Sequence, residues 1–337
     1  TPVAVAAGIG RAGKAGVLIK GGIHLQNLGK ILVVAFDKTG TLTHGKPAVT
    51  DVVVLEGDRR EFLTLAYHLE KYSEHPLARA VVDAAQEINP VALEVTDFES
   101  LTGAGVKARV MGRSFLVGKP DLFLGLGAGI NGDVARLEGE GKTVIALGTP
   151  DKIHGLIALQ DRPRLQARDV IGALHDMGVR TVVLTGDNEI TARAVGREAG
   201  IDEIKANLKP EDKIRAVREL KEKYGAVAMI GDGVNDAPAL AEATVGIAMG
   251  VAGTDAAIEA ADVALMSDDL AKIPFAIRLG RRARRISLQN IVFSIGILAV
   301  LVPGAVLGLM GIALAVVAHE VSELLAVVNG LRVARGE

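Results

Sequence analysis

Short apolar runs alternate with helical patterns along the middle of the chain. Three of these runs, 31–36, 181–185 and 226–230, are each followed within two residues by an aspartate among small residues. Continuous apolar runs of this length are typical of strands buried in a parallel sheet. The segments between the last two runs, 188–200 and 209–225, have a helical pattern of apolar and charged positions. The alternation predicts a doubly wound α/β sheet with its aspartates gathered at one edge.

The stretch between the first and second apolar runs does not follow this rhythm. It contains two helical patterns, at 60–73 and 76–88, and then short strand-like pieces separated by glycine turns. Such a mixture predicts a separate α+β domain inserted after the first strand. We expect the insert over 47–151 and the domain that it interrupts over 30–46 and 152–276.

The last fifty residues are the most apolar part of the chain. Residues 289–309 contain no charged side chain and are long enough to cross a bilayer as a helix, and 312–331 form a second candidate span. Arginines gather at 278–285 and follow again after the second span, which favours a hairpin with both ends in the cytosol. We therefore predict a basic stalk and a transmembrane hairpin over 277–337. The alternative is a buried helical hairpin of a soluble protein.

The first 29 residues are rich in Ala, Gly and Val and do not begin with Met. They have no signal-peptide layout, so we expect the end of a membrane helix and its stalk, and hence a fragment of a longer protein. The net charge of −2 and an aromatic content of 3% argue against a nucleic-acid partner. The absence of Cys excludes disulfides, thiolate metal ligands and a cysteine nucleophile within this chain.

The aspartates that follow the strands are the candidates for chemistry. Asp37 comes at the end of the first apolar run, where open α/β sheets form their sites. Clustered carboxylates suit Mg²⁺, and a carboxylate can also attack phosphorus to give an aspartyl-phosphate. Lys213 could neutralise charge on a phosphoryl group, and Thr185 and Gly186 could donate hydrogen bonds to it. The alternative for any one of these aspartates is a helix cap.

The segments DKTGTLT, TGD and GDGVNDAPAL resemble the signature motifs of the P-type ATPases, ion pumps with a haloacid-dehalogenase-like phosphorylation domain. The resemblance implies that ATP phosphorylates Asp37 and that Mg²⁺ is held by Asp37, Thr39 and Asp232. It also implies a phosphate-binding or catalytic role for a further set of residues: Lys38, Thr185, Gly186, Asp187, Lys213, Asn235 and Asp236.

The insert resembles the nucleotide-binding domain of the same family. SEHPLA at 73–78 is similar to the motif of the heavy-metal-transporting branch, which implies that Glu74 and His75 lie near the adenine of ATP. TGAGVKA supplies Gly103 and Gly105, which would let the nucleotide approach the backbone, and Gly118 is expected in the same pocket.

Two further segments resemble the family. DRPR at 161–164 is similar to its hinge, with Asp161 and Arg164 as the residues to test. In the second span, His319, Glu320 and Ser322 are the candidate ligands of the transported ion, because ionisable residues inside a membrane usually mark a pathway.

The His-Glu pair resembles the HEG(S/T) motif of cobalt/zinc-type pumps, although Val321 and Glu323 depart from it and Leu298 stands where a zinc/cadmium/lead pump would have Lys. We expect Co²⁺ or Zn²⁺. The alternative is a structural pairing of His319 with Glu320 or with a helix outside this chain.

Three readings follow. The preferred hypothesis is the C-terminal portion of a heavy-metal pump in a membrane, with its catalytic domains in the cytoplasm. Its ligands would be ATP, Mg²⁺ and a divalent metal ion. We expect the upstream membrane helices and the actuator domain to belong to the missing upstream part of the same pump. The fold of this chain would be a haloacid-dehalogenase-like doubly wound parallel sheet with an inserted α+β nucleotide-binding domain, plus a C-terminal two-helix transmembrane hairpin. The alternatives are a membrane-anchored phosphatase or phosphotransferase of the same superfamily and a non-enzymatic metal-binding membrane partner.

Overall fold

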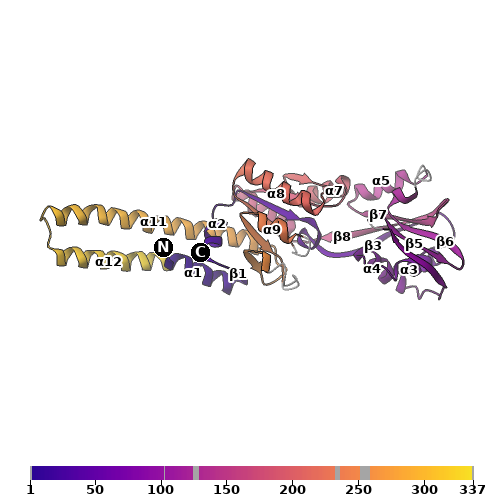
Figure 1. Ribbon diagram of the computed structural model, residues 1–337, viewed down its shortest axis with the longest axis horizontal. Coiled ribbons are helices and arrows are strands. Elements are labelled where there is room, and N and C mark those ends of the chain that lie inside the picture. Colours follow the sequence, from indigo (N-terminus) through magenta and orange to yellow (C-terminus); the bar gives the residue numbers. More distant parts are fainter. Residues whose placement is uncertain (1, 102, 124–128, 232–235, 251–258, 336–337) are drawn as a thin grey trace. The chain divides into compact units, whose positions relative to one another are not determined.

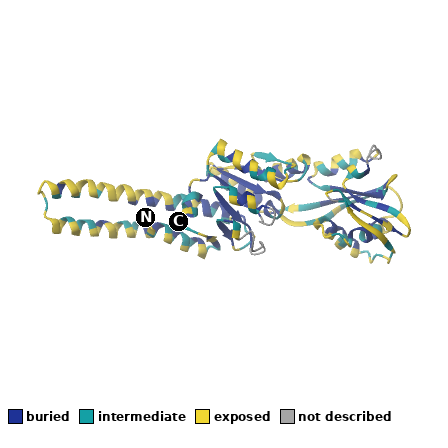
Figure 2. Cartoon of the chain, viewed as in Figure 1, coloured by how far each residue is buried: buried dark blue, intermediate teal, exposed yellow. Residues whose placement is uncertain are grey.

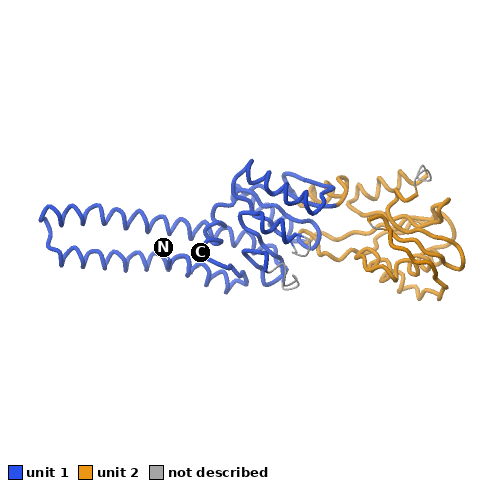
Figure 3. The backbone as a smooth tube through the Cα atoms, in the orientation of Figure 1, with its two compact units in different colours: residues 1–41, 165–186, 200–337 blue, residues 42–164, 187–199 orange. Residues whose placement is uncertain are grey.

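The computed structural model describes residues 2–101, 103–123, 129–231, 236–250 and 259–335. The chain divides into two compact units (Figure 3). Unit 1 comprises residues 1–41, 165–186 and 200–337, and unit 2 comprises residues 42–164 and 187–199.

Unit 1 contains a seven-stranded sheet in the order β1-β13-β12-β11-β2-β9-β10. Every neighbouring pair is parallel except β1 and β13 at one edge. This arrangement confirms the predicted doubly wound parallel sheet. The strands are β1 (Val17–Ile19), β2 (Val33–Asp37), β9 (Arg180–Leu184), β10 (Glu203–Lys205), β11 (Val227–Gly231), β12 (Val245–Ala248) and β13 (Val263–Leu265).

Strand β2 lies where the strand order reverses. From β2 the chain runs to β9 and β10 on one side, and then returns to β11, β12 and β13 on the other. The carboxyl end of a strand at such a switch point opens into a crevice, because the flanking connections leave in opposite directions. The last residue of β2, Asp37, is therefore placed at the position where doubly wound folds bind their ligands.

Helices connect the strands of this sheet: α2 (Gly22–Leu28), α6 (Ala167–Asp176), α8 (Pro210–Tyr224) and α9 (Ala237–Glu242). Helix α8 shows why the sequence folds this way locally. Pro210 stands in its first turn, acidic residues follow, and Gly225 with φ +93° ends it. Its apolar side buries Val217 and Leu220 against the core of the sheet.

Unit 2 is built on a six-stranded antiparallel sheet in the order β3-β8-β7-β6-β5-β4. Its strands are β3 (Thr43–Val54), β4 (Val95–Leu101), β5 (Gly105–Val110), β6 (Arg113–Gly118), β7 (Thr143–Thr149) and β8 (Lys152–Pro163). Its helices are α3 (Arg59–Glu70), α4 (Pro76–Gln86), α5 (Asn131–Gly139) and α7 (Glu189–Ala199), with a short 3₁₀ helix at Pro120–Phe123.

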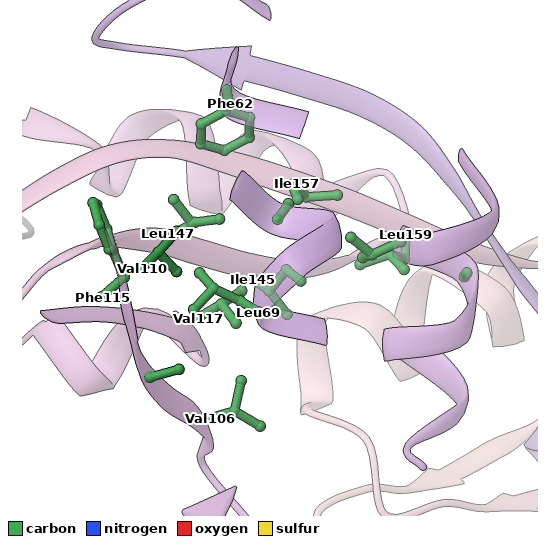
Figure 4. Close-up of a cluster of buried hydrophobic side chains, with 14 residues drawn as sticks. Phe62, Leu69, Val106, Val110, Phe115, Val117, Ile145, Leu147, Ile157 and Leu159 are labelled. Carbon is green, nitrogen blue, oxygen red and sulfur yellow. The ribbon is translucent and has the colours of Figure 1, made fainter. Parts of the chain in front are cut away.

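Unit 2 has the predicted α+β composition but is longer than the insert expected over 47–151. Strands β3 and β8 pair along most of their lengths, from Thr43 with Pro163 to Val54 with Gly155. Residues before 47 and after 151 therefore also belong to the sheet of unit 2. Between the sheet and helices α3 and α4 lies a core that includes Phe62, Leu69 and Ile157 (Figure 4).

The described part of unit 1 also contains α1 (Pro2–Lys14), α11 (Lys272–Val306) and α12 (Ile312–Leu331). Helices α11 and α12 pack against each other (Figure 1) and are both long and apolar enough to cross a membrane. The predicted stalk and first span form one continuous helix, since α11 starts at Lys272. Beyond Leu288 nearly all of its apolar side chains are exposed (Figure 2), as expected of a surface that faces lipid.

Candidate functional site

Asp37 is the last residue of β2 in unit 1 and is buried. The chain then turns sharply through Lys38–Leu42. Gly40 in this turn has φ +74°, a left-handed conformation that favours glycine. The side chain of Lys38 is buried and Thr39 is exposed, so the turn presents Thr39 at the edge of the sheet next to Asp37.

A buried ion-pair cluster lies at this edge. The Nζ atom of Lys213, in the first turn of α8, lies 2.5 Å from Oδ1 of Asp37 and 2.8 Å from Oδ1 of Asp236. Burial works to lower the pKa of Lys213, but the two carboxylates outweigh burial and hold that pKa above its usual range. Two carboxylates against one ammonium leave the cluster with a net negative charge.

Thr185 and Gly186 follow β9, the neighbour of β2. Because Asp37 pairs in register with Leu184, Thr185 lies at the same edge of the sheet as Asp37. The backbone of Thr185 is fixed from both sides: its N–H donates to Lys205 and its carbonyl accepts from Leu208, each at 3.0 Å. Asp187 is the next residue along the chain and begins the second segment of unit 2.

The last motif is described in part. Asp232 and Asn235 lie outside the described residues, and Asp236 is buried beside Lys213. A Cβ added to Gly231 would lie 2.7 Å from Oδ2 of Asp236, so a larger residue there would push this carboxylate away.

Hard carboxylate oxygens and a net negative charge fit Mg²⁺. Among the described residues, however, no group of three or more Asp, Glu or His side chains could hold a metal ion by itself. A Mg²⁺ site at Asp37 would therefore need donors beyond these side chains.

The hinge residues predicted in DRPR form a compact cluster within unit 2. Oδ2 of Asp161 accepts from the Thr43 hydroxyl at 2.5 Å and from the Gly45 N–H at 3.0 Å, and its Oδ1 accepts from the Lys46 N–H at 3.2 Å. Nε of Arg164 donates to the Thr43 carbonyl at 3.0 Å. The two residues join the start of β3 to the end of β8, the two strands on which the chain enters and leaves the insert.

His75 begins helix α4. Its Nδ1 accepts from the Leu77 N–H at 3.2 Å, and Pro76 occupies the first turn. Partial burial lowers the pKa of His75, so the ring is neutral at pH 7 and its Nε2–H remains a donor. Glu74 is exposed beside it. The preceding loop lies over β4, since the rings of Tyr72 and Phe98 are 5.7 Å apart.

The predicted glycines serve two different purposes. Gly105 and Gly118 pair across β5 and β6, and a Cβ on either would lie 2.2 Å from a backbone oxygen of the other strand's segment. These two glycines are required by the sheet itself. Gly103 has φ +72° in the turn before β5, and a Cβ there would meet open space. Of the three, only Gly103 leaves backbone open to an incoming ligand.

Sequence reasoning missed Glu70. This carboxyl at the end of α3 is buried, and burial raises its pKa to about 7. The signal was present in the helical spacing, because Glu70 falls eight residues after Phe62 and four after Ala66 on the buried side of α3. Glu70 is therefore a buried, titratable acid in the core of unit 2.

The three candidate ligands on α12 are not drawn together. Nε2 of His319 lies 3.4 Å from Oε1 of Glu323, which sequence analysis did not select, and Glu320 is exposed. The hydroxyl of Ser322 donates to the backbone carbonyl of His319 at 2.7 Å. His319 is thus paired with Glu323 one turn later, and the alternative pairing with Glu320 is not observed.

Comparisons with known proteins agree with this geometry. The haloacid dehalogenase-like hydrolase family matches residues 31–244. The chain is 44% identical to the cadmium-transporting ATPase of Staphylococcus aureus, over 99% of this chain and 48% of that protein. It is 40% identical to the zinc-transporting ATPase of Bacillus subtilis, over 96% of this chain and 51% of that protein.

A solved structure is similar as well. The crystal structure of a zinc-transporting PIB-type ATPase in the E2.Pi state matches with a TM-score of 0.79 and 40% identity, over 99% of this chain and 55% of that one. The chain thus spans about half the length of the curated relatives. This homology and the two apolar helices indicate a membrane location. The chain belongs to the haloacid dehalogenase-like hydrolase family and is homologous over nearly its whole length to the heavy-metal P-type ATPases.

Proposed function

We propose that this chain is the catalytic and C-terminal membrane portion of an ATP-driven heavy-metal pump, with Asp37 as the residue that is phosphorylated. The observation that carries the proposal is the buried cluster of Asp37, Lys213 and Asp236 at the switch point of the sheet. A structural ion pair would not require a carboxylate that is followed by a sharp turn with an exposed threonine at the sheet edge.

The chemistry follows from this arrangement. A carboxylate oxygen of Asp37 attacks the γ-phosphorus of ATP, the bond to the β-γ bridging oxygen breaks, and ADP leaves. The ammonium of Lys213 neutralises charge on the transferring oxygens, and Thr185 offers a hydroxyl at the same edge. Mg²⁺, held by Asp37 and Asp232 with Thr39 beside it, would supply further neutralisation when bound.

Unit 2 is proposed to bind the nucleotide. The neutral His75 offers an Nε2–H donor, Gly103 leaves the backbone open, and Glu74 is exposed beside the ring. Gly105 and Gly118 would support the site by allowing β5 and β6 to approach closely.

The proposed cargo is a divalent heavy-metal ion. The relatives are named for cadmium, zinc and copper transport. A ligand set drawn from His319, Glu320, Ser322 and Glu323 contains imidazole and carboxylate groups, which suit borderline divalent ions such as Zn²⁺ or Co²⁺ better than Cu⁺. Export from the cytosol, with the catalytic units cytoplasmic and the hairpin in the bilayer, completes the proposal.

A membrane-anchored phosphatase is the alternative. It shares the haloacid-dehalogenase-like sheet, but a simple phosphatase needs neither a six-stranded insert with its own core nor an ionisable pair inside a membrane helix. Both features favour the pump.

The pump is tested by metal-stimulated ATP hydrolysis in sealed vesicles, on the protein that carries the upstream membrane helices. We expect Zn²⁺, Co²⁺ or Cd²⁺ to stimulate hydrolysis and to accumulate inside inverted vesicles, and Asp37→Asn to abolish both. Hydrolysis of small phosphate esters that is indifferent to these metals and to ATP would favour the phosphatase instead.

A further inference from the structure

The hairpin meets the membrane surface at a defined place on each helix. On α11 the exposed apolar side chains begin at Leu288 and continue through Ile291 and Val292. On α12 they end at Leu331, and Arg332 follows directly. One boundary of the apolar surface therefore lies close to Leu288 and Leu331, at the end of the hairpin that joins α1 and the rest of unit 1.

Several arginines at this boundary already have partners. Arg281 donates to the carbonyls of Met177 and Ile31, at 2.6 and 3.2 Å. Arg282 donates to the carbonyl of Arg332 at 2.9 Å, and Arg11 donates to the carbonyl of Val333 at 3.3 Å. These guanidinium groups hold the ends of the helices to one another.

Arg284 and Arg285 differ from them. Both side chains are exposed, and among the described residues neither has a hydrogen-bond or ion-pair partner. At 1.5 Å per residue they lie about 4.5 to 6 Å along the helix from Leu288. Two adjacent guanidinium groups thus lie about one helical turn from Leu288, the first exposed side chain of the apolar stretch.

None of the described acidic side chains forms an ion pair with Arg284 or Arg285. Helix α11 contains no Asp or Glu, and none occurs in α12 after Glu323 or in the first 36 residues of the chain. The loop at the other end of the hairpin, 307–311, carries no charge. The hairpin is therefore strongly asymmetric, with cations gathered at one membrane surface only.

We propose that Arg284 and Arg285 form a binding site for the phosphate groups of anionic phospholipids in the leaflet at this end of the hairpin. A guanidinium presents paired donors that match phosphate oxygens, and arginines next to a membrane helix attract anionic lipid. The positive charge of these arginines would be enough to orient the hairpin in the membrane. A lipid-binding site also requires exposed side chains without an ion-pair partner, and among the described residues Arg284 and Arg285 meet both conditions.

The test measures lipid selectivity directly. The chain is reconstituted in phosphatidylcholine bilayers, and the electron paramagnetic resonance spectra of spin-labelled phosphatidylglycerol and phosphatidylcholine give their relative association with the protein. We expect about fivefold preference for phosphatidylglycerol for each arginine that engages a lipid. The preference should fall toward one in Arg284→Gln/Arg285→Gln and in 1 M salt.

A matched double variant removes the same charge elsewhere. Arg278→Gln/Arg168→Gln changes two exposed arginines of unit 1 that lie farther from the boundary, and it should retain the preference. Equal association of the two lipids with the wild type would overturn the proposal and would favour a protein partner for Arg284 and Arg285 instead. A preference that survives in Arg284→Gln/Arg285→Gln, or is lost equally in the control, would also overturn it.

Discussion

The buried carboxyl of Glu70 makes the stability of unit 2 depend on pH. Burial raises its pKa from 4.5 to about 7, so the folded state holds the proton more tightly than the unfolded state. The resulting stabilisation is complete below pH 4.5 and is lost as the pH rises through about 7. The difference corresponds to a free energy of unfolding on the order of 3 kcal/mol.

We therefore predict that Glu70→Gln makes α3 and its neighbours more stable than wild type at pH 8, and removes most of the pH dependence between 5 and 8. Hydrogen exchange followed by mass spectrometry, corrected for intrinsic rates, measures this in peptides from α3 and β5. Glu61→Gln, an exposed change on the same helix, is the control. Equal pH dependence in wild type and Glu70→Gln would refute the prediction.

Lys213 balances two buried carboxylates. In Lys213→Met, Asp37 and Asp236 would face each other's charge without an ammonium between them, and we expect a loss of about 3 kcal/mol in the free energy of unfolding at pH 7. Because the pKa of Lys213 is raised above its usual value near 10.5, the wild-type contribution is fully present at neutral pH and is lost only in strong alkali.

The same variant should respond more strongly to Mg²⁺, because the remaining charge is more negative. Calorimetric unfolding with and without millimolar Mg²⁺ checks both effects, with the exposed Lys209→Met as the control. If Mg²⁺ stabilised Lys213→Met no more than wild type, the two carboxylates would not form part of a cation site.

At the scale of elements, α11 joins the membrane to the catalytic sheet without a break. Where it passes α2, Gly280 and Gly29 bring the two backbones together, and a Cβ on Gly280 would lie 2.6 Å from the Gly29 nitrogen. Arg281 on the next position binds the Ile31 carbonyl, directly upstream of the strand that ends in Asp37. The contact gives unit 1 a direct link between hairpin and site.

Gly280→Ala should therefore destabilise unit 1 by about 1 to 3 kcal/mol, because the added methyl has no room between the two backbones. Gly296→Ala, in the same helix, meets nothing within 4 Å and should be neutral or slightly stabilising. Thermal unfolding in detergent micelles compares the two. Equal effects would mean that the close approach of α2 and α11 contributes nothing to stability.

The elements were largely predictable because their patterns are local. The apolar runs identified β2, β9 and β11, and the two long apolar stretches identified the hairpin. What could not be predicted depends on pairing between distant segments. The long ladder of β3 with β8 extends unit 2 beyond the expected insert, and the partner of Gly105 proved to be Gly118 across the sheet.

The candidate site was also predictable from the sequence only in part. Asp37 was selected from its place at a strand end, and Lys213 and Asp236 from the resemblance of their motifs to a known family. The fold places Nζ of Lys213 2.5 Å from Oδ1 of Asp37 and 2.8 Å from Oδ1 of Asp236. Glu70 was missed because an acid is normally read as exposed, and only its helical register places it inside. On α12 the pairing of His319 with Glu323 rather than Glu320 follows from the helical turn.

For the whole molecule, two units carry complementary parts of one proposed reaction. Unit 1 contains the proposed phosphoryl acceptor and the apolar hairpin, and unit 2 contains the candidate nucleotide site. The proposed pump requires a covalent intermediate at Asp37, since transfer of the γ-phosphoryl group to Asp37 is the step that would couple ATP to the conformation of the protein.

The most direct test is brief incubation with γ-labelled ATP and Mg²⁺, acid quench and a hydroxylamine wash, comparing wild type with Asp37→Asn. The account predicts an acid-stable label that hydroxylamine removes and that Asp37→Asn lacks, because an acyl phosphate reacts with hydroxylamine whereas a phosphoserine or phosphothreonine does not. A label of unchanged intensity in Asp37→Asn, or one that resists hydroxylamine, would contradict it.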